Sequence, residues 1–383
     1  MLVEHGGVEA AATVAERIVE VLGTPFTVQG TEVSIRGSIG IAVSRRQRAG
    51  AEALVRDADV AMYTAKASGK GGVAIFQPHL YTAVVRRHRL KADLQRAVDN
   101  GSFVLHYQPI CDLGSTDITA IEALIRWRRP GRGLVRPQEF IPLAEETGLI
   151  LPIGHWVLEQ ALEEAGRWEQ VSGKPAPRLS VNVSTRQVQQ PGFVHELADI
   201  VAHHDFPASK LTLEITETLM MQDVERTIER LEQIRALGTL IALDDFGTGW
   251  SSMAWLREFP VDALKMPKQF LGALGASEDE WEFARAIVTL GHSLELEVVA
   301  EGIEHADQVA RLRSIGVDAG QGFYFSPPVE ADQVPALLGM STDPRPTPMV
   351  RRRRTSRSNG SRLVVPMPNE LLRLHPASGR SGV

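Results

Sequence analysis

Short apolar runs alternate with amphipathic stretches from residue 103 to about residue 338. A short apolar run bounded by turn residues is typical of a buried strand, whereas apolar residues spaced three and four apart predict a helix. We therefore expect strands at residues 103–108, 118–127, 179–183, 211–215, 240–244, 263–266, 297–300 and 322–325. We expect the intervening helices at residues 152–170, 192–203, 224–236, 280–294 and 306–315.

Eight strands that alternate with helices predict an α/β fold, and the rhythm and length fit a (β/α)8 barrel of the TIM type. A doubly wound open sheet is the alternative arrangement. Polar residues at the ends of successive strands favour the barrel, because the carboxyl ends of barrel strands converge on one face.

The first 78 residues have a different pattern, which predicts a small α+β unit. Its expected elements are helices at residues 8–22 and 51–68 and strands at residues 26–28, 32–43 and 73–76. Residues 79–100 predict a helical connector whose many charges form a solvated face. We thus divide the chain into residues 1–78, the connector 79–100, the barrel 101–340 and a tail 341–383.

The tail is rich in Pro, Arg and Ser and includes the run Arg351-Arg352-Arg353-Arg354. A segment this polar cannot bury a core, so we expect it to be disordered. Contact of its arginines with a nucleic acid or a membrane surface is the alternative interpretation.

Composition narrows the class of protein. Apolar residues make up 43% of the 383 residues, enough for a sizeable core, and the formal net charge of −6 argues against binding to duplex nucleic acid. The single cysteine, Cys111, excludes an internal disulfide. No apolar run is long enough to span a membrane, and the first residues do not resemble a signal peptide, so we expect a cytoplasmic protein.

Polar and charged residues lie in or just after the last parts of the expected barrel strands. They are Glu122, Asn182, Glu214, Asp244, Asp245, Lys265, Glu301 and Gln321. Any one of them has an ordinary explanation as an ion-pair partner or a turn residue, and Asp244 and Asp245 alone would fit a turn and a helix cap. Together, carboxylates and an amide that recur at strand ends predict an oxygen-rich site for Mg²⁺ or Mn²⁺ rather than for zinc.

Several stretches carry a resemblance to a known family. The segment Ile121-Glu122-Ala123-Leu124 contains the signature of EAL domains, the phosphodiesterases of bacterial cyclic di-GMP. Further matching stretches begin at Tyr107, Phe140, Asn182, Leu213, Asp244, Ala300 and Gln321. The chain therefore resembles an EAL domain over essentially the whole barrel segment.

The resemblance implies roles for individual residues. Glu122, Asn182, Glu214 and Asp244 would bind one metal ion, and Asp244 would bridge to a second ion held with Asp245 and Glu301. Lys265 would orient the nucleophile, and three polar side chains would hold the ligand or support the site, namely Gln108, Arg126 and Gln321. Glu217 would pin the loop after Asp245, and a homodimer through the barrel is implied. The implied reaction is hydrolysis of cyclic di-GMP to linear pGpG with two Mg²⁺ or Mn²⁺ ions.

One departure from the family pattern bears on turnover. The family usually continues Leu-Lys-Ile-Asp in the sixth strand, whereas this chain has Leu264-Lys265-Met266-Pro267. Proline has neither a charge nor a backbone N–H. The alternative function is therefore a degenerate barrel that binds cyclic di-GMP or a partner protein without hydrolysis.

The first 78 residues resemble the C-terminal half of a GGDEF (diguanylate cyclase) domain. The resemblance is carried by the stretch Ser38–Ala42 and by the stretch Asp57–Lys66. The GTP-binding hairpin of that family would lie upstream of Met1, so we expect a truncated remnant without cyclase activity, or a chain whose true start lies further upstream.

Overall fold

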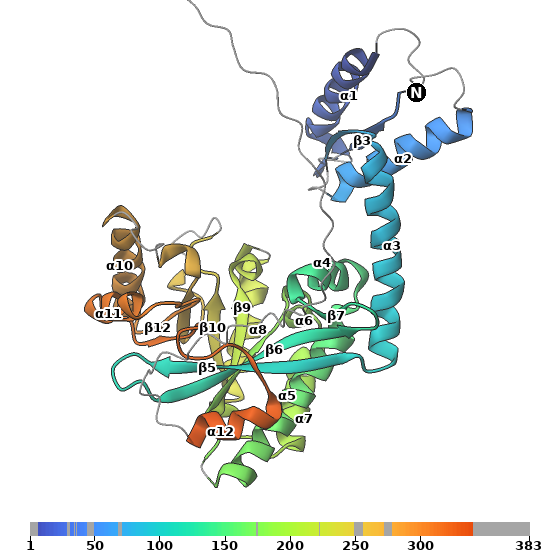
Figure 1. Cartoon of the computed structure of the whole chain (residues 1–383). Coiled ribbons are helices and arrows are strands. Elements are labelled where there is room, and N and C mark those ends of the chain that lie inside the picture. Colours follow the sequence, from blue (N-terminus) through green and yellow to red (C-terminus); the bar gives the residue numbers. More distant parts are fainter. Residues whose placement is uncertain are drawn as a thin grey trace, which may run out of the picture. The chain divides into compact units, whose positions relative to one another are not determined.

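The structure is a computed structural model that describes residues 7–28, 31–33, 35, 37–43, 50–67, 71–173, 175–221, 223–248, 256–271 and 278–339. Several expectations fall outside these residues: the tail from residue 341, residues 249–255 of the loop after Asp245, and residues 1–6. Figure 1 shows the described elements along the chain. No helix among them is both long enough and apolar enough to cross a membrane.

The N-terminal elements form a small α/β unit. They are α1 (Gly7–Gly23), β1 (Phe26–Val28), β2 (Thr31–Val33), β3 (Ser38–Ile41), α2 (Ala51–Ala67) and β4 (Gly72–Ile75). Strands β1 and β2 form a hairpin, and β3 and β4 pair in parallel with α2 as the crossover. A Cβ at Gly40 would lie 2.0 Å from the carbonyl oxygen of Ala58, so glycine lets α2 pack directly on β3. The two stretches that carry the GGDEF resemblance therefore pack against each other.

Helix α3 (Pro78–Asp99) is the expected connector. Its last turns bury Leu94 and Ala97 in the same apolar core as the barrel strands, and Asp93 forms an ion pair with Arg129 of β6. The C-terminal end of the connector is thus packed into the core of the barrel.

Eight strands close into the predicted barrel. In spatial order they are β5 (Phe103–Asp112), β6 (Ile118–Arg129), β8 (Arg178–Asn182), β9 (Leu211–Thr216), β10 (Leu240–Asp244), β11 (Ala263–Met266), β12 (Glu297–Ala300) and β13 (Ala319–Gly320), and β13 returns to β5. Pairing is parallel from β6 through β13. The closed order excludes the open doubly wound sheet.

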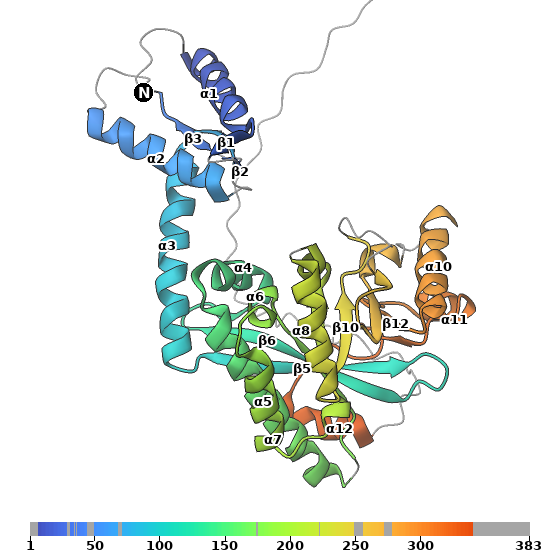
Figure 2. The same ribbon diagram turned by 180° about the vertical axis from the view of Figure 1, so that it is seen from behind.

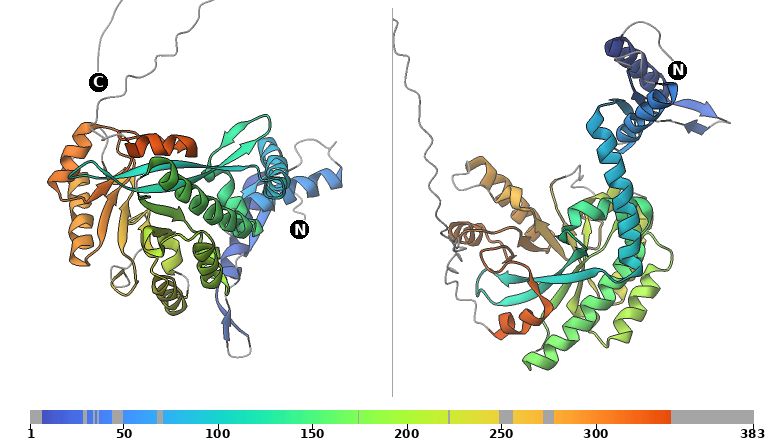
Figure 3. Two further views of the ribbon diagram at one scale, coloured as in Figure 1. Left: turned by 90° about the horizontal axis from the view of Figure 1, so that it is seen from below. Right: turned by 45° about the vertical axis from the view of Figure 1, so that its right-hand side comes forward.

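The first strand differs from a simple (β/α)8 repeat. Strand β5 runs antiparallel to both β6 and β13, and the long β5–β6 hairpin is clear in Figure 3. The physical reason is the connection: only residues 113–117 separate β5 from β6, and a parallel crossover needs about a dozen residues or more. The hairpin places Gln108 directly opposite Glu122.

Helices cover the outside of the barrel, as Figures 1 and 2 show. They are α4 (Pro137–Thr147), α5 (Ile150–Ser172), α6 (Thr185–Val188), α7 (Phe193–His203), α8 (Val224–Ala236), α10 (Glu278–Ser293), α11 (Ala306–Ser314) and α12 (Val334–Gly339). Short 3₁₀ turns complete the connections: η1 (Ala208–Lys210), η2 (Glu217–Met221), η3 (Lys268–Phe270) and η4 (Ala331–Gln333). Strands β7 (Gly133–Val135) and β14 (Val329–Glu330) extend the sheet beside β6 and β5.

The expected last strand at residues 322–325 is wrong. The eighth strand is the two-residue β13 at Ala319–Gly320, and residues 322–325 form a turn. Backbone crowding explains the turn, because a Cβ at Gly322 would lie 2.1 Å from the carbonyl oxygen of Ile303. The turn starts directly after Gln321 and so sets the position of that side chain.

Candidate metal and phosphodiester site

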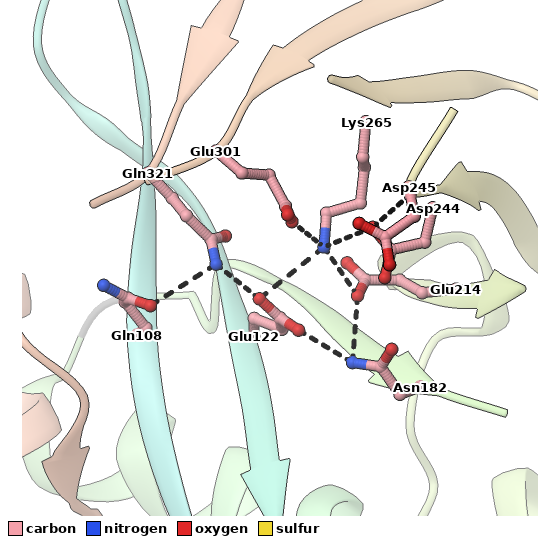
Figure 4. A network of polar contacts seen from close by, with 9 residues as sticks. All are labelled: Gln108, Glu122, Asn182, Glu214, Asp244, Asp245, Lys265, Glu301 and Gln321. Carbon is pink, nitrogen blue, oxygen red and sulfur yellow. Dashed lines mark hydrogen bonds and ion pairs between the residues drawn. The ribbon is translucent and has the colours of Figure 1, made fainter. Parts of the chain in front are cut away.

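The barrel brings the predicted strand-end residues together, as Figure 4 shows. Glu122 lies within β6, Asn182 ends β8, Glu214 lies in β9 and Asp244 ends β10. Lys265 lies in β11, and Glu301 and Gln321 directly follow β12 and β13. Because side chains alternate along a strand and neighbouring strands are in register, residues from seven strands reach one point inside the mouth.

Two buried glutamates share one amide. Asn182 Nδ2 lies 2.7 Å from Glu122 Oε1 and 3.1 Å from Glu214 Oε2. Among the described residues, the second oxygen of Glu214, Oε1, is buried and has no hydrogen-bond partner. Since the amide oxygen and nitrogen of an asparagine can exchange places by a flip, the same three side chains can present oxygens to a cation.

Lys265 lies at the centre of the carboxylates and is 1% exposed. Its Nζ is 2.6 Å from Glu301 Oε1 and 2.7 Å from Glu214 Oε2. The same nitrogen is 3.6 Å from Glu122 Oε2 and 3.8 Å from Asp244 Oδ1. Burial alone would favour a neutral lysine, but these four carboxylates raise the pKa of Lys265 well above its ordinary value.

The carboxylates differ in their affinity for protons. Burial, then repulsion from Glu122, raises the pKa of Glu214 well above its ordinary value. Burial also raises the pKa of Glu301, to about 7, although Lys265 opposes the shift. At Glu122 burial acts in the same direction, but Lys265 and hydrogen bonds from Gln321 and Asn182 outweigh it and lower the pKa. Burial and neighbouring carboxylates thus outweigh Lys265 at Glu214 and Glu301, but not at Glu122.

A second group of oxygens lies at the edge of this cluster. One ligand atom each from Asp244, Asp245 and Glu301 lies within 4.8 Å of the others. Asp245 has a left-handed backbone with φ of 55°, which aspartate tolerates better than most residues, and its N–H donates to Asp244 Oδ1 at 2.9 Å. The backbone turn therefore directs adjacent carboxylates toward one space.

The residues present fit divalent metal ions. Five carboxyl groups surround one buried ammonium, and a buried glutamate oxygen lacks a partner among the described residues. Buried charge of this kind is stabilised by a cation, and an all-oxygen donor set matches Mg²⁺ or Mn²⁺.

Two glutamines line the other side of Glu122. Gln321 Nε2 donates to Glu122 Oε2 and lies 3.4 Å from Gln108 Oε1, while Gln108 Nε2 donates to the carbonyl of Ser326 at 2.9 Å. Both glutamine side chains are buried. The Ser326 carbonyl was missed from the sequence, because a backbone group in a turn leaves no residue-type signal.

Two predicted site residues lie outside this network. Arg126 is on the same face of β6 as Glu122, four residues further along, and donates to the carbonyl of Ile125 at 2.8 Å. Glu217 is buried at the start of η2. It is expected to pin the loop after Asp245, of which residues 249–255 lie outside the described residues, so that role stays a prediction.

Pro267 directly follows β11 and is buried. Met266 is paired with Ala300, and the N–H of Glu301 donates to the Met266 carbonyl at 2.9 Å. Position 267 therefore lies beside Glu301 and, by strand alternation, on the same face as Lys265. A side chain there would face the second group of oxygens.

Comparisons with known proteins identify the family of the barrel. The EAL domain family model matches residues 91–328, and the model of the diguanylate cyclase, GGDEF domain matches residues 2–72. The chain is 36% identical over 338 residues to MucR of Pseudomonas aeruginosa, a bifunctional diguanylate cyclase/cyclic di-GMP phosphodiesterase, with 88% of this chain and 49% of MucR covered. It is 34% identical over 331 residues to the cyclic di-GMP phosphodiesterase PdeR of Escherichia coli, covering 86% of this chain and 50% of PdeR.

Solved structures show the same barrel. The MucR phosphodiesterase in complex with cyclic di-GMP has a TM-score of 0.61 at 38% identity, and the match covers 64% of this chain and 99% of that chain. The EAL enzyme Bd1971, bound to cAMP and cyclic di-GMP, has a TM-score of 0.64 at 35% identity and covers 67% of this chain and 70% of that chain.

The chain spans about half the length of curated relatives such as MucR and PdeR. The EAL domain model nevertheless covers more than half of this chain and includes every clustered polar residue described above. The chain therefore belongs to the EAL domain family.

Proposed function

We propose that this chain hydrolyses cyclic di-GMP to linear pGpG with two Mg²⁺ or Mn²⁺ ions. The observation that carries the proposal is the buried cluster of five carboxylates and one amide around Lys265 at the barrel mouth. Glu122, Asn182, Glu214 and Asp244 would hold one ion, and Asp244, Asp245 and Glu301 would hold the other.

The other residues of the site would have separate roles in the reaction. Divalent ions, when bound, would lower the pKa of a water molecule and polarise the phosphodiester. Lys265 keeps its proton and offsets the negative charge of the cluster next to Glu214 and Glu301. Arg126, on the same face of β6 as Glu122, would bind a phosphate oxygen. Gln321 would hold Glu122 in position, and Gln108, which contacts Gln321, would hold the ligand.

A second candidate function is a cyclic di-GMP receptor, and Pro267 favours it. Position 267 lies beside Glu301 and carries no oxygen ligand in its side chain. A weaker second metal site would leave ligand binding largely intact while slowing hydrolysis.

The test is to incubate the full chain with cyclic di-GMP and either Mn²⁺ or Mg²⁺, and to follow pGpG by chromatography. We expect product from the wild type and none above background from Glu122→Ala, which removes a metal ligand. Tight binding of cyclic di-GMP without product under both ions would overturn the hydrolase and support the receptor.

We also propose the division into residues 1–78, 79–100, 101–340 and 341–383, together with a homodimer formed through the barrel. The separate family matches over residues 2–72 and 91–328 support the first division. Light scattering of the full chain with and without cyclic di-GMP would test the dimer.

Divalent metal binding should strengthen as the pH rises through neutrality. The pKa of Glu301 is about 7 and that of Glu214 is well above its ordinary value, so at lower pH a metal ion must displace protons from them. We expect Mn²⁺ affinity to increase from about pH 6 to about pH 8, with net proton release. Calorimetry in two buffers of different ionisation enthalpy measures both the Mn²⁺ affinity and the number of protons released. An affinity that does not change over this pH range would contradict the assignment of Glu214 and Glu301 as metal ligands.

A further inference from the structure

A second group of metal-ligating side chains lies on the outside of the barrel. Glu159 of α5 and the adjacent pair His203 and His204 at the end of α7 offer one ligand atom each, and these atoms lie within 4.8 Å of one another. Helices α5 and α7 run side by side, as Figures 1 and 2 show. Among the described residues, this group and the one at Asp244, Asp245 and Glu301 are the two sets of this kind.

The chemistry of this group differs from that of the barrel mouth. His204 Nε2 lies 2.7 Å from Glu159 Oε2, and the rings of His203 and His204 meet edge to face with centroids 5.0 Å apart. Two imidazoles and one carboxylate form a donor set that suits Zn²⁺ better than Mg²⁺. We propose that Glu159, His203 and His204 bind a Zn²⁺ ion that links α5 to α7.

The surroundings favour a cation. The N–H of His204 donates to the Ile200 carbonyl at 3.2 Å, so the pair lies at the C-terminal end of α7, where the helix dipole is negative. The His204 side chain is 15% exposed and that of Glu159 is 35% exposed, so the ion would be partly shielded yet open to a water as a further ligand.

The scaffold holds the donors in place. Leu158 and Leu162 flank Glu159 on α5 and are buried in the core, as are Leu197 and Ile200 on α7. Zinc with bonds of about 2.1 Å places tetrahedral ligands about 3.4 Å apart. Binding therefore requires the 2.7 Å contact between His204 and Glu159 to open slightly and any wider separation among the three ligand atoms, all within 4.8 Å of one another, to close.

The position indicates a structural role for the ion. Residues 204–210 lead from the end of α7 into the start of β9, so the group lies toward the face of the barrel opposite the carboxylate cluster. In barrels of this type the opposite face contributes to stability rather than to chemistry.

A neighbouring ion pair supplies a matched control. His155 Nδ1 of α5 lies 2.6 Å from Glu196 Oε1 of α7, so it joins the same two helices through the same pair of groups. No third donor completes a metal-binding set there among the described residues. His155→Ala therefore removes a histidine–carboxylate pair without touching the proposed site.

The experiment is a Zn²⁺ titration of the full chain by calorimetry, in a Glu214→Gln background that weakens binding at the barrel mouth. We expect one Zn²⁺ per chain to be lost, or bound at least about tenfold more weakly, in His203→Ala and in Glu159→Gln, and to be retained in His155→Ala. The first variant changes an exposed side chain and keeps the ion pair, so it is not expected to disturb folding.

Melting curves give a second measurement. Zn²⁺ should raise the melting temperature of the parent and of His155→Ala, and should raise it less in His203→Ala. The same number and affinity of Zn²⁺ sites in parent, His203→Ala and Glu159→Gln would overturn the proposal and leave an ion pair only.

Discussion

The Glu214→Gln variant is expected to lose hydrolysis of cyclic di-GMP and yet to melt at a higher temperature than the wild type when divalent ions are absent. Glu214 is 1% exposed, burial and Glu122 raise its pKa, and its Oε1 has no partner among the described residues. Glutamine keeps the shape and removes the charge, so it relieves repulsion between buried carboxylates that Lys265 offsets only in part. We expect at least about a 100-fold loss of kcat with Mn²⁺, and a gain of roughly 2–4 °C in Tm for each kcal/mol relieved.

Glu297→Gln is the matched control. Glu297 also lies in a barrel strand, but at the start of β12, where it accepts two hydrogen bonds from Arg178 at 2.7 and 2.8 Å. Its neutralisation leaves Arg178 without its partner, so Tm should fall while the number of Mn²⁺ ions bound stays the same. A Glu214→Gln protein that melts lower without ions and still turns over would show that Glu214 is only a partner of Lys265.

The Pro267→Asp variant is expected to raise hydrolysis at least about tenfold, because it adds a carboxylate beside the second group of oxygens. The backbone at Pro267 has φ of −71° and ψ of 155°, which aspartate adopts without strain. The position also precedes η3 as its N-cap, where aspartate is a favoured residue. The backbone at position 267 therefore accepts aspartate.

The Pro267→Ala variant distinguishes the effect of the added carboxylate from the effect of removing the proline ring. It removes the proline ring and restores the N–H but adds no ligand, so we expect its rate to stay close to that of the wild type. The measurement is kcat at several Mn²⁺ concentrations, with calorimetry to count ions. Equal rates for the two variants would show that a carboxylate at position 267 plays no part in hydrolysis here.

The cluster was predictable because its members lie within or directly after buried runs. Asp244 and Glu301 come directly at the end of strongly apolar strands, and strand ends of a barrel must meet at one face. The sequence thus predicted the cluster without any distance information. It did not predict that Lys265 would lie at the centre of four carboxylates, because the depth of a side chain depends on the register of all the strands.

The apolar and polar pattern of the sequence does not predict two features of the fold. The two-residue β13 is too short to show the alternation of apolar and polar residues that is typical of a strand. The apolar turn at residues 322–325 that follows it resembles a strand instead. The antiparallel β5 did leave a signal, since five residues between two strands favour a hairpin over a crossover, but the alternation of strands and helices elsewhere concealed it.

The β5–β6 hairpin at the seam of the barrel has a consequence for protein synthesis. Gln321 donates to Glu122 across 199 residues of sequence, and Gln108 reaches the Ser326 carbonyl across 218. At a translation rate of about 5–20 residues per second, roughly 10–40 seconds pass between the synthesis of Glu122 and that of Gln321. A nascent chain therefore carries Gln108 and Glu122 long before the seam can close, and we expect fragments that stop before residue 319 to be inactive.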